Sequence, residues 1–240
     1  MKKYITAILL TAVLISCGKD ENTMTINGNI KGLKLGTLYF QRLSDSATYV
    51  NIDTFKIDGD GKFTFETPIE EPEVFFIYLD KKDQNPLNDR LMVFGESGEI
   101  NIESTRDYFT VNAKITGSKL QEKYDEYRQI KSKYSHKNLD WIEQKFKAAK
   151  RDKKEKVDSL NKLIDQNTRR SYLYSINYCI NNKNSEVAPY VALTDLTQTS
   201  VKYLDTINNS LSDNVASSKY GKLLNEYIGE IKKVKDSLKK

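Results

Sequence analysis

Between Thr23 and Ile115, apolar and polar residues alternate with a period of two, and turn residues interrupt the alternation at short intervals. This pattern is typical of β-strands that bury one face, and short strands at such spacing favour an antiparallel sandwich or a partly open barrel. We therefore expect about eight strands. They centre on residues 24–30, 38–40, 50–57, 63–65, 74–79, 91–94, 99–103 and 109–115.

Three local patterns add detail to this half. The alternation changes phase near Asp53-Thr54, which predicts a β-bulge there. Asp58-Gly59-Asp60-Gly61 predicts a hairpin turn, because glycine adopts positive φ at little cost. Val74 to Leu79 is apolar on both faces, as a central strand covered on both sides would be. The Asp-Gly loop is not expected to bind calcium, because the twelfth position of an EF-hand loop needs Glu and is Ile69 here.

After Gly117 the apolar period becomes that of a helix. Ser118 and Gln121 have the spacing of a capping box. The apolar stripe that follows runs to Tyr178 with a break at residues 135–138, which predicts one long amphipathic helix or an antiparallel helical hairpin. Residues 181–185 end this segment, and Ser217 or Ser218 is expected to cap the last helix. Three shorter helices are expected at residues 187–196, 201–211 and 220–234.

The two parts of the chain also differ in charge. Residues 18–117 contain 11 Lys and Arg against 17 Asp and Glu, a net charge of −6, whereas residues 118–240 contain 25 against 16, a net charge of +9. We place a domain boundary near Gly117, between a β-rich domain (23–117) and an all-helical domain (118–240) of an α+β chain. The basic residues alternate with acidic ones, as on solvated helix faces, so no nucleic-acid partner is expected. Anionic lipid headgroups or an acidic polysaccharide suit the charge better.

Residues 1–16 have the pattern of a secretory signal. A cationic start, Met1-Lys2-Lys3, precedes an apolar run from Tyr4 to Ile15, which is shorter than the about 20 residues needed to span a bilayer. The run ends in Leu14-Ile15-Ser16-Cys17, which resembles the lipobox of bacterial lipoproteins rather than an Ala-x-Ala cleavage site. We expect cleavage between Ser16 and Cys17 and lipidation of Cys17. A plain signal peptide followed by a chance cysteine is the alternative.

Residues 17–22 would then form a lipidated tether. Two or more acyl chains hold a protein durably at a leaflet without a transmembrane helix. Gly18 is not the aspartate that signals retention in the inner membrane, and the charged residues Lys19, Asp20 and Glu21 resemble a short signal for export to the outer face of the outer membrane. We expect a lipid-anchored protein of the outer membrane that is exposed at the cell surface. A solvated tether on a protein that faces the periplasm is the alternative.

No set of residues in the sequence predicts a reaction. The single histidine, His136, lies in a polar segment without a catalytic partner, and the chain has no metal-binding spacing of His or Cys and no glycine-rich phosphate loop. We therefore expect no metal and no cofactor. The carboxylates are numerous enough for a glycosidase-like pair, but no spacing singles out a pair.

Cys179 has no partner cysteine once Cys17 carries lipid, which leaves no structural disulfide and no redox pair. Its apolar neighbours predict that it lies on the buried side of a helix, and an intermolecular disulfide is the alternative. Tyr172, Tyr174 and Tyr178 have the helical spacing of packing residues, and a platform for sugar rings is the alternative.

Six segments carry a resemblance to known proteins. They are residues 25–32 (TINGNIKG), 36–40 (GTLYF), 60–65 (DGKFTF), 70–73 (EEPE), 184–190 (NSEVAPY) and 217–222 (SSKYGK). The first four resemble the β-rich N-terminal domain of unknown function that precedes a thioredoxin-like domain in lipid-anchored thiol–disulfide oxidoreductases, and the last two resemble the segment just before that catalytic domain. The Trp-Cys-x-x-Cys motif of that family has no counterpart before Lys240, so we expect no redox activity from this chain.

Together these patterns favour a non-catalytic lipoprotein, anchored in the outer membrane, that presents a binding module to a protein or glycan partner in the envelope or outside the cell. Two alternatives stay open. One is an accessory role in thiol–disulfide exchange with a separate thioredoxin-like protein, and the other is a hydrolase with an unrecognised carboxylate pair.

Overall fold

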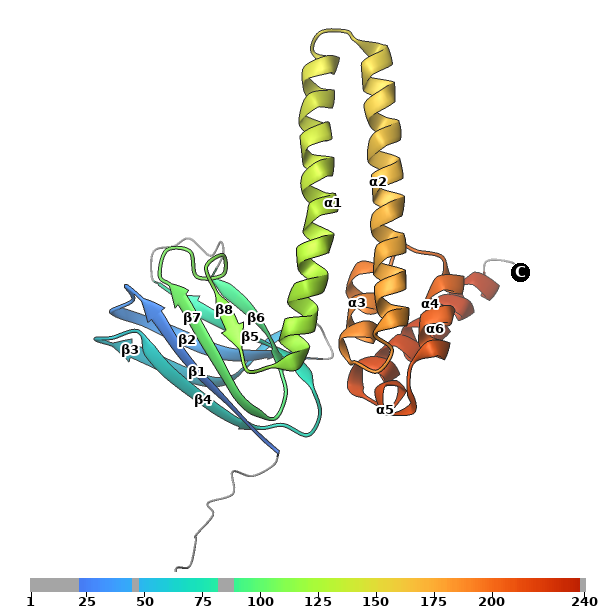
Figure 1. The fold of residues 1–240 in the computed structure, drawn as a ribbon. Helices are drawn as coiled ribbons and strands as arrows, with labels where there is room; N and C mark the ends of the chain where they lie inside the picture. Colours follow the sequence, from blue (N-terminus) through green and yellow to red (C-terminus); the bar gives the residue numbers. More distant parts are fainter. Residues whose placement is uncertain (1–21, 45–47, 82–88, 238–240) are drawn as a thin grey trace, which may run out of the picture.

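A computed structural model describes residues 22–44, 48–81 and 89–237 (Figure 1). Within these residues the chain forms eight strands followed by six helices, which confirms the expected α+β class. The strands are β1 (Thr23–Lys31), β2 (Leu35–Leu43), β3 (Tyr49–Asp58), β4 (Lys62–Pro68), β5 (Glu73–Asp80), β6 (Arg90–Gly95), β7 (Gly98–Thr105) and β8 (Lys114–Thr116). The helices are α1 (Lys119–Ala149), α2 (Lys154–Asn181), α3 (Val187–Asp195), α4 (Val201–Ser210), α5 (Asp213–Ala216) and α6 (Lys219–Ser237).

The strands form an open sandwich of two four-stranded sheets, with the orders β4-β1-β7-β8 and β3-β2-β5-β6. All pairs are antiparallel except β1 and β7, which are parallel. In the core between the sheets, the ring of Phe40 stacks on those of Phe65 and Phe75 with centroids 5.2 and 5.1 Å apart. The expected sandwich is therefore confirmed, with one parallel pair, and it does not close into a barrel.

The turn at residues 58–61 is present, but it does not close the expected hairpin. β3 pairs with β2 and β4 pairs with β1, so the turn carries the chain from one sheet to the other. Ile57 and Phe63, on either side of the turn, both enter the core, and alternation alone does not distinguish this arrangement from a hairpin. Gly61 has φ +49, and a Cβ there would lie 2.2 Å from the carbonyl oxygen of Ile30, so this position requires glycine.

The expected bulge near Asp53-Thr54 is confirmed, because the pairing of β3 with β2 shifts at the adjacent Ile52. The last strand differs from the expectation. β8 begins at Lys114 rather than near residue 109. Phe109 lies in a turn, and its fully buried ring fills the core of the sandwich. An apolar residue at this position therefore does not indicate a strand.

α1 and α2 form a long antiparallel hairpin that projects from the rest of the molecule (Figure 1). The expected break at residues 135–138 is wrong, because α1 continues through it. This segment has neither glycine nor proline, and Asn138 bonds across to α2, donating to Thr168 (3.1 Å) and accepting from Asn167 (2.8 Å). The turn lies instead at residues 150–153, where Asp152 has φ +52. The expected ends of α2, α3, α4 and α6 are confirmed within two to three residues, and α5 was not expected.

Only half of the expected capping box forms at the start of α1. The Ser118 hydroxyl accepts from the backbone N–H of Gln121 (3.0 Å), as expected. The side chain of Gln121 does not return to Ser118, because its carbonyl oxygen accepts from the backbone N–H of Phe94 on β6 (2.7 Å). At the start of α6, the Ser218 hydroxyl accepts from the N–H of Gly221 (3.4 Å), so Ser218 is the capping residue there.

A second core joins the sheets to the helices. Val74 on β5 and Phe94 on β6 belong to the same buried cluster as the inner faces of all six helices. The strand β5 therefore faces the sandwich core on one side and the helices on the other, which confirms that the segment from Val74 to Leu79 is covered on both faces. In the described ranges no helix combines the length and apolar character needed to cross a membrane.

Candidate functional site at the base of the helical hairpin

The helices dock on the sandwich through Phe94 at the edge strand β6. The outer backbone groups of Phe94 are satisfied by side chains rather than by another strand: Gln121 accepts from its N–H, and the Ser118 hydroxyl donates to its carbonyl oxygen (2.9 Å). Its ring contacts three tyrosines at centroid distances of 6.2, 5.4 and 6.1 Å, namely Tyr124, Tyr190 and Tyr220. The hydroxyl of Tyr220 also accepts from the N–H of Val74 (2.8 Å). This junction therefore fixes the helices to the sheet through buried, directional bonds.

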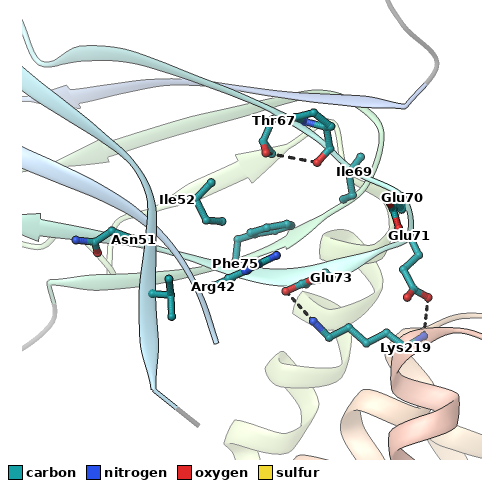
Figure 2. A pocket seen from close by; sticks show the side chains of 12 residues that line it. Arg42, Asn51, Ile52, Thr67, Ile69, Glu70, Glu71, Glu73, Phe75 and Lys219 are labelled. Atoms are coloured by element: carbon teal, nitrogen blue, oxygen red, sulfur yellow. Dashed lines mark hydrogen bonds and ion pairs between the residues drawn. The ribbon is translucent and has the colours of Figure 1, made fainter. Parts of the chain in front are cut away.

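A cleft of about 620 Å³ lies beside the junction, between β3, β4, β5 and the start of α6 (Figure 2). Two of its three carboxylates hold the sandwich to α6: Glu71 accepts from the backbone N–H of Lys219 (2.6 Å), and Glu73 pairs with the Lys219 ammonium (2.8 Å). Arg42 and apolar side chains such as Phe75 complete the lining. Glu71 and Glu73 both bond to Lys219, so the charged residues of this cleft connect the sandwich to α6.

A hydrogen-bonded cluster of four polar side chains lies at the base of the hairpin. The Tyr127 hydroxyl of α1 donates to the carboxylate of Asp195 on α3 (2.5 Å) and bonds with the hydroxyl of Ser175 on α2 (2.8 Å). The ammonium of Lys131 on α1 lies 3.1 Å from the Ser175 hydroxyl and 3.6 Å from the Asp195 carboxylate. Burial raises the pKa of Tyr127, and the bond to Asp195 raises it further, so the phenol keeps its proton and remains a donor.

Ser175 and Lys131 have the spacing of a nucleophile and its base, but the arrangement does not allow attack on a substrate. Ser175 is fully buried, and its hydroxyl is already bonded to Tyr127 and to the carbonyl oxygen of Ser171 (3.1 Å). The cluster instead holds Lys131 and Asp195 in place. Their side chains stay 20% and 29% exposed, so they present fixed charges of both signs at the surface.

Lys131 and Asp195 open into a pocket of about 390 Å³ between α1, α2 and the end of α3. Its lining contains no aliphatic side chain and consists of Lys131, Tyr134, Ser135, Asn138, Thr168, Ser171, Tyr172, Thr194, Asp195, Thr197 and Gln198. Among the residues described, the side chains of Ser135, Thr197 and Gln198 form no hydrogen bond with the protein. Most small-molecule pockets are lined mainly by apolar groups, so this pocket suits a ligand that is itself rich in hydroxyl groups.

The tyrosines of α2 pack within the helical region, and one of them also lines this pocket. Tyr174 and Tyr178 pack against Tyr127 with centroids 5.6 and 4.8 Å apart, and the Tyr178 hydroxyl donates to the carbonyl oxygen of Lys123 (2.8 Å). Tyr172 lines the pocket, and the Lys131 ammonium lies 5.7 Å from the centre of its ring. The packing interpretation therefore holds for all three tyrosines, since Tyr172 also packs against the helical core, and the half-buried ring of Tyr172 in addition lines the pocket.

The other candidate residues from the sequence lie elsewhere. Ser16, Cys17, Lys19, Asp20 and Glu21 lie outside the described residues. Cys179 is a free cysteine that is fully buried, as expected, and burial raises the pKa of its thiol to about 12. His136 is exposed on α1. No group of three metal-ligating side chains gathers in the part of the chain that the structure describes.

The sequence did not single out Lys131 or Asp195, although Lys131 gives a weak signal. It lies four residues after the buried Tyr127 and therefore on the inner face of α1. Asp195 comes 64 residues later at the end of α3. Only the register of the hairpin brings the two together, and no local pattern encodes it.

The chain is thus an open β-sandwich followed by a helical region with a polar pocket. Residues 24–124 form a domain that matches the family described as "Domain of unknown function (DUF4369)". The match extends past β8 into the first turns of α1, so it includes Ser118 and Gln121 of the junction.

No curated protein matches the chain. Among solved structures, the chain is similar to sea bream transthyretin in complex with thyroxine, with 14% sequence identity and a TM-score of 0.27. That alignment covers 40% of this chain and 96% of the transthyretin chain.

Proposed function

We propose that this chain is a lipid-anchored protein of the outer membrane that binds a glycan in the polar pocket at the base of the hairpin and catalyses no reaction of its own. The composition of that pocket carries the proposal. Two tyrosine rings and nine polar or charged side chains line it. Sugar rings offer an apolar face for stacking and many hydroxyl groups for hydrogen bonds, and this lining supplies partners for both.

The lipobox at Leu14-Ile15-Ser16-Cys17 supports the anchor. The start of β1 lies at the opposite end of the molecule from the tip of the hairpin (Figure 1). A chain held through Cys17 and residues 18–22 would therefore keep the sandwich near the membrane and direct the hairpin away from it. The pocket between these two ends would be open to a polymer outside the leaflet.

The two alternative functions have weaker support. An accessory role in thiol–disulfide exchange needs a reactive thiol, but Cys179 is buried and its pKa is raised, which disfavours the nucleophilic thiolate. The domain match at residues 24–124 names no activity. A hydrolase needs an accessible nucleophile or carboxylate pair. In the part of the chain that the structure describes, Ser175 and Lys131 form a close serine–lysine pair, but Ser175 is fully buried.

Glycan binding is tested by titrating oligosaccharides of neutral and acidic composition into the protein and following binding by calorimetry. We expect Tyr172→Ala and Gln198→Ala to weaken binding at least tenfold, because they remove a stacking ring and a side-chain amide that forms no hydrogen bond with other described residues. Tyr108→Ala is the matched control, since Tyr108 is 62% exposed and lies outside the pocket. Equal affinity of all three variants, or no binding by the parent, contradicts the proposal.

The anchor is tested separately. Radiolabelled palmitate should enter the natural chain and not a Cys17→Ala variant, and the variant should leave the membrane fraction. Protease treatment of intact cells then distinguishes the two faces of the outer membrane, because a chain at the cell surface is digested and one that faces the periplasm is not. Labelling of the variant, or its retention in membranes that are washed with salt, contradicts the anchor.

A further inference from the structure

The tip of the α1–α2 hairpin concentrates positive charge. Residues 144–156 contain seven Lys and Arg and two acidic residues, a net charge of +5, which equals the net charge of the whole 240-residue chain. The rest of the molecule is therefore neutral on balance. The basic residues of the tip are Lys145, Lys147, Lys150, Arg151, Lys153, Lys154 and Lys156.

The protein itself compensates little of this charge. Lys147 pairs with Glu143 one turn earlier on α1. The other six basic side chains of the tip have no carboxylate partner in the ranges that the structure describes, and all but Lys145 are exposed. The tip is also well formed, because its turn is closed by backbone bonds from Lys150 to Phe146 (3.1 Å) and from Lys153 to Ala148 (3.1 Å). The charges therefore sit on a rigid support.

Helix stability does not explain the cluster. The macrodipole favours cations at the end of α1, where Lys147 and Lys150 lie, but it disfavours them at the beginning of α2. Lys153 occupies the N-cap position of α2 without a side-chain capping bond, and Lys154 and Lys156 flank Glu155, the acidic residue of the first turn. A residue set chosen for folding alone would place acidic or hydroxyl side chains there, so the lysines point to a partner outside the chain.

An aromatic ring lies among these charges. Phe146 is 64% exposed, although a phenylalanine is usually buried. It lies one turn from the end of α1, a helix of 31 residues that is roughly 46 Å long at 1.5 Å per residue. The ring and the charges are therefore held at the end of the molecule that is farthest from the start of β1 (Figure 1).

We propose that the tip of the hairpin binds an acidic polysaccharide, with Lys150, Arg151, Lys153 and Lys154 pairing with its carboxylate groups and Phe146 stacking on a sugar ring. This inference rests on the proposed function in one respect, the orientation set by the anchor. In that orientation the tip points away from the anchoring leaflet. A chain that lay flat to reach the leaflet would bring the acidic sandwich, with a net charge of −6 over residues 18–117, against the same anionic surface. A polymer that extends from the membrane can reach the tip without this repulsion.

The test uses the full chain with Cys17→Ala, so that no acyl group contributes, and polygalacturonate as the probe. We expect binding that is lost when salt rises from about 0.1 to about 1 M, where the Debye length falls from about 10 to about 3 Å. A tip variant with K150Q, R151Q, K153Q and K154Q should bind on the order of a hundredfold more weakly. F146A should weaken binding roughly two- to tenfold.

The matched control carries K202Q, K222Q, K233Q and K235Q on α4 and α6, which change the net charge by the same amount far from the tip. It should keep nearly full affinity, and neutral dextran should not bind. Equal losses in the tip and control variants, or no binding of polygalacturonate at low salt, overturn the proposal. Stronger binding to phosphatidylglycerol vesicles or to duplex DNA than to polygalacturonate also overturns it. Palmitate labelling of Cys17 and oligosaccharide binding at Tyr172 are measured independently, so a failure at the tip is distinct from a failure of the proposed function.

Discussion

Removal of a single hydroxyl group at the junction should measure how strongly the sandwich and helices are coupled. In Tyr220→Phe the ring remains, so its contacts with Phe94 and Tyr190 are kept at centroid distances of 6.1 and 5.1 Å. The change removes only the acceptor of the 2.8 Å bond from the backbone N–H of Val74. Val74 is 4% exposed, so water cannot replace the lost oxygen.

The expected cost follows from this burial. A buried donor left without a partner costs about 1–3 kcal/mol, more than the net value of an average hydrogen bond. For a domain of 150–250 residues, each kcal/mol lowers the unfolding temperature by about 2–4 °C. Tyr220→Phe should therefore lower the midpoint by about 2–12 °C. Tyr203→Phe is the control, because Tyr203 is 44% exposed and its hydroxyl forms no hydrogen bond with other described residues.

Amide hydrogen exchange gives a local readout of the same change. In Tyr220→Phe the protection of the Val74 amide should fall by more than that of the Phe94 amide, whose acceptor is Gln121 and is untouched. The reasoning is refuted if Tyr220→Phe unfolds like Tyr203→Phe within about 0.5 kcal/mol and the Val74 amide stays as protected as in the parent. That result would mean that the bond contributes nothing to the junction.

Three further predictions use the same structure. Gly221→Ala should lower the free energy of unfolding in urea by about 1–3 kcal/mol, because the new Cβ would lie 2.1 Å from the carbonyl oxygen of Val215. Gly229→Ala on the same helix meets no atom within 4 Å and should raise that free energy by up to about 1 kcal/mol. The reverse order of stabilities would contradict the packing of α5 on α6. Cys179 should not react with a thiol reagent at pH 8 until the protein is denatured, because its pKa is raised to about 12 and it is fully buried; rapid labelling of the native protein would contradict this. Burial raises the pKa of Tyr127 above its ordinary value of 10.0, so this tyrosine ionises in the unfolded chain before it ionises in the folded one. The free energy of unfolding should therefore be unaffected by Tyr127 below pH 10 and should fall as the pH rises further. The fall should be smaller in Tyr127→Phe, and an equal fall would contradict the raised pKa of Tyr127.

The faces of the strands could be predicted from the sequence, whereas their partners could not. Alternation is a local property, and residues such as Ile57 and Phe63 do reach the core as their phase indicates. The same alternation is compatible with a hairpin at residues 58–61 or with a crossing between sheets, because both bury the same side chains. The choice is made by the pairing of β4 with β1 and of β3 with β2, which is a long-range property.

The candidate site was hidden for a related reason. Sequence patterns singled out residues with unusual chemistry or local spacing, such as Cys17 and His136. The pocket is lined by two tyrosines and by ordinary polar residues from three helices and the segment after α3, and its charged pair joins Lys131 to Asp195 across 64 positions. Apart from Tyr172, none of these residues stands out in the sequence, so only the register of the hairpin reveals them as a group.

Gln121 shows how tertiary structure can overrule a local rule that the sequence obeys. Its side chain has one carbonyl oxygen that can accept either the N–H of Ser118, as a capping box would have it, or the N–H of Phe94. Substitutions that remove an N-terminal capping bond typically cost about 1 kcal/mol. Leaving the Phe94 N–H without a partner in the core would cost about 1–3 kcal/mol, because Phe94 is fully buried. The glutamine therefore turns to β6 (2.7 Å), and the residue that the sequence identifies as part of a helix cap instead binds the helices to the sheet.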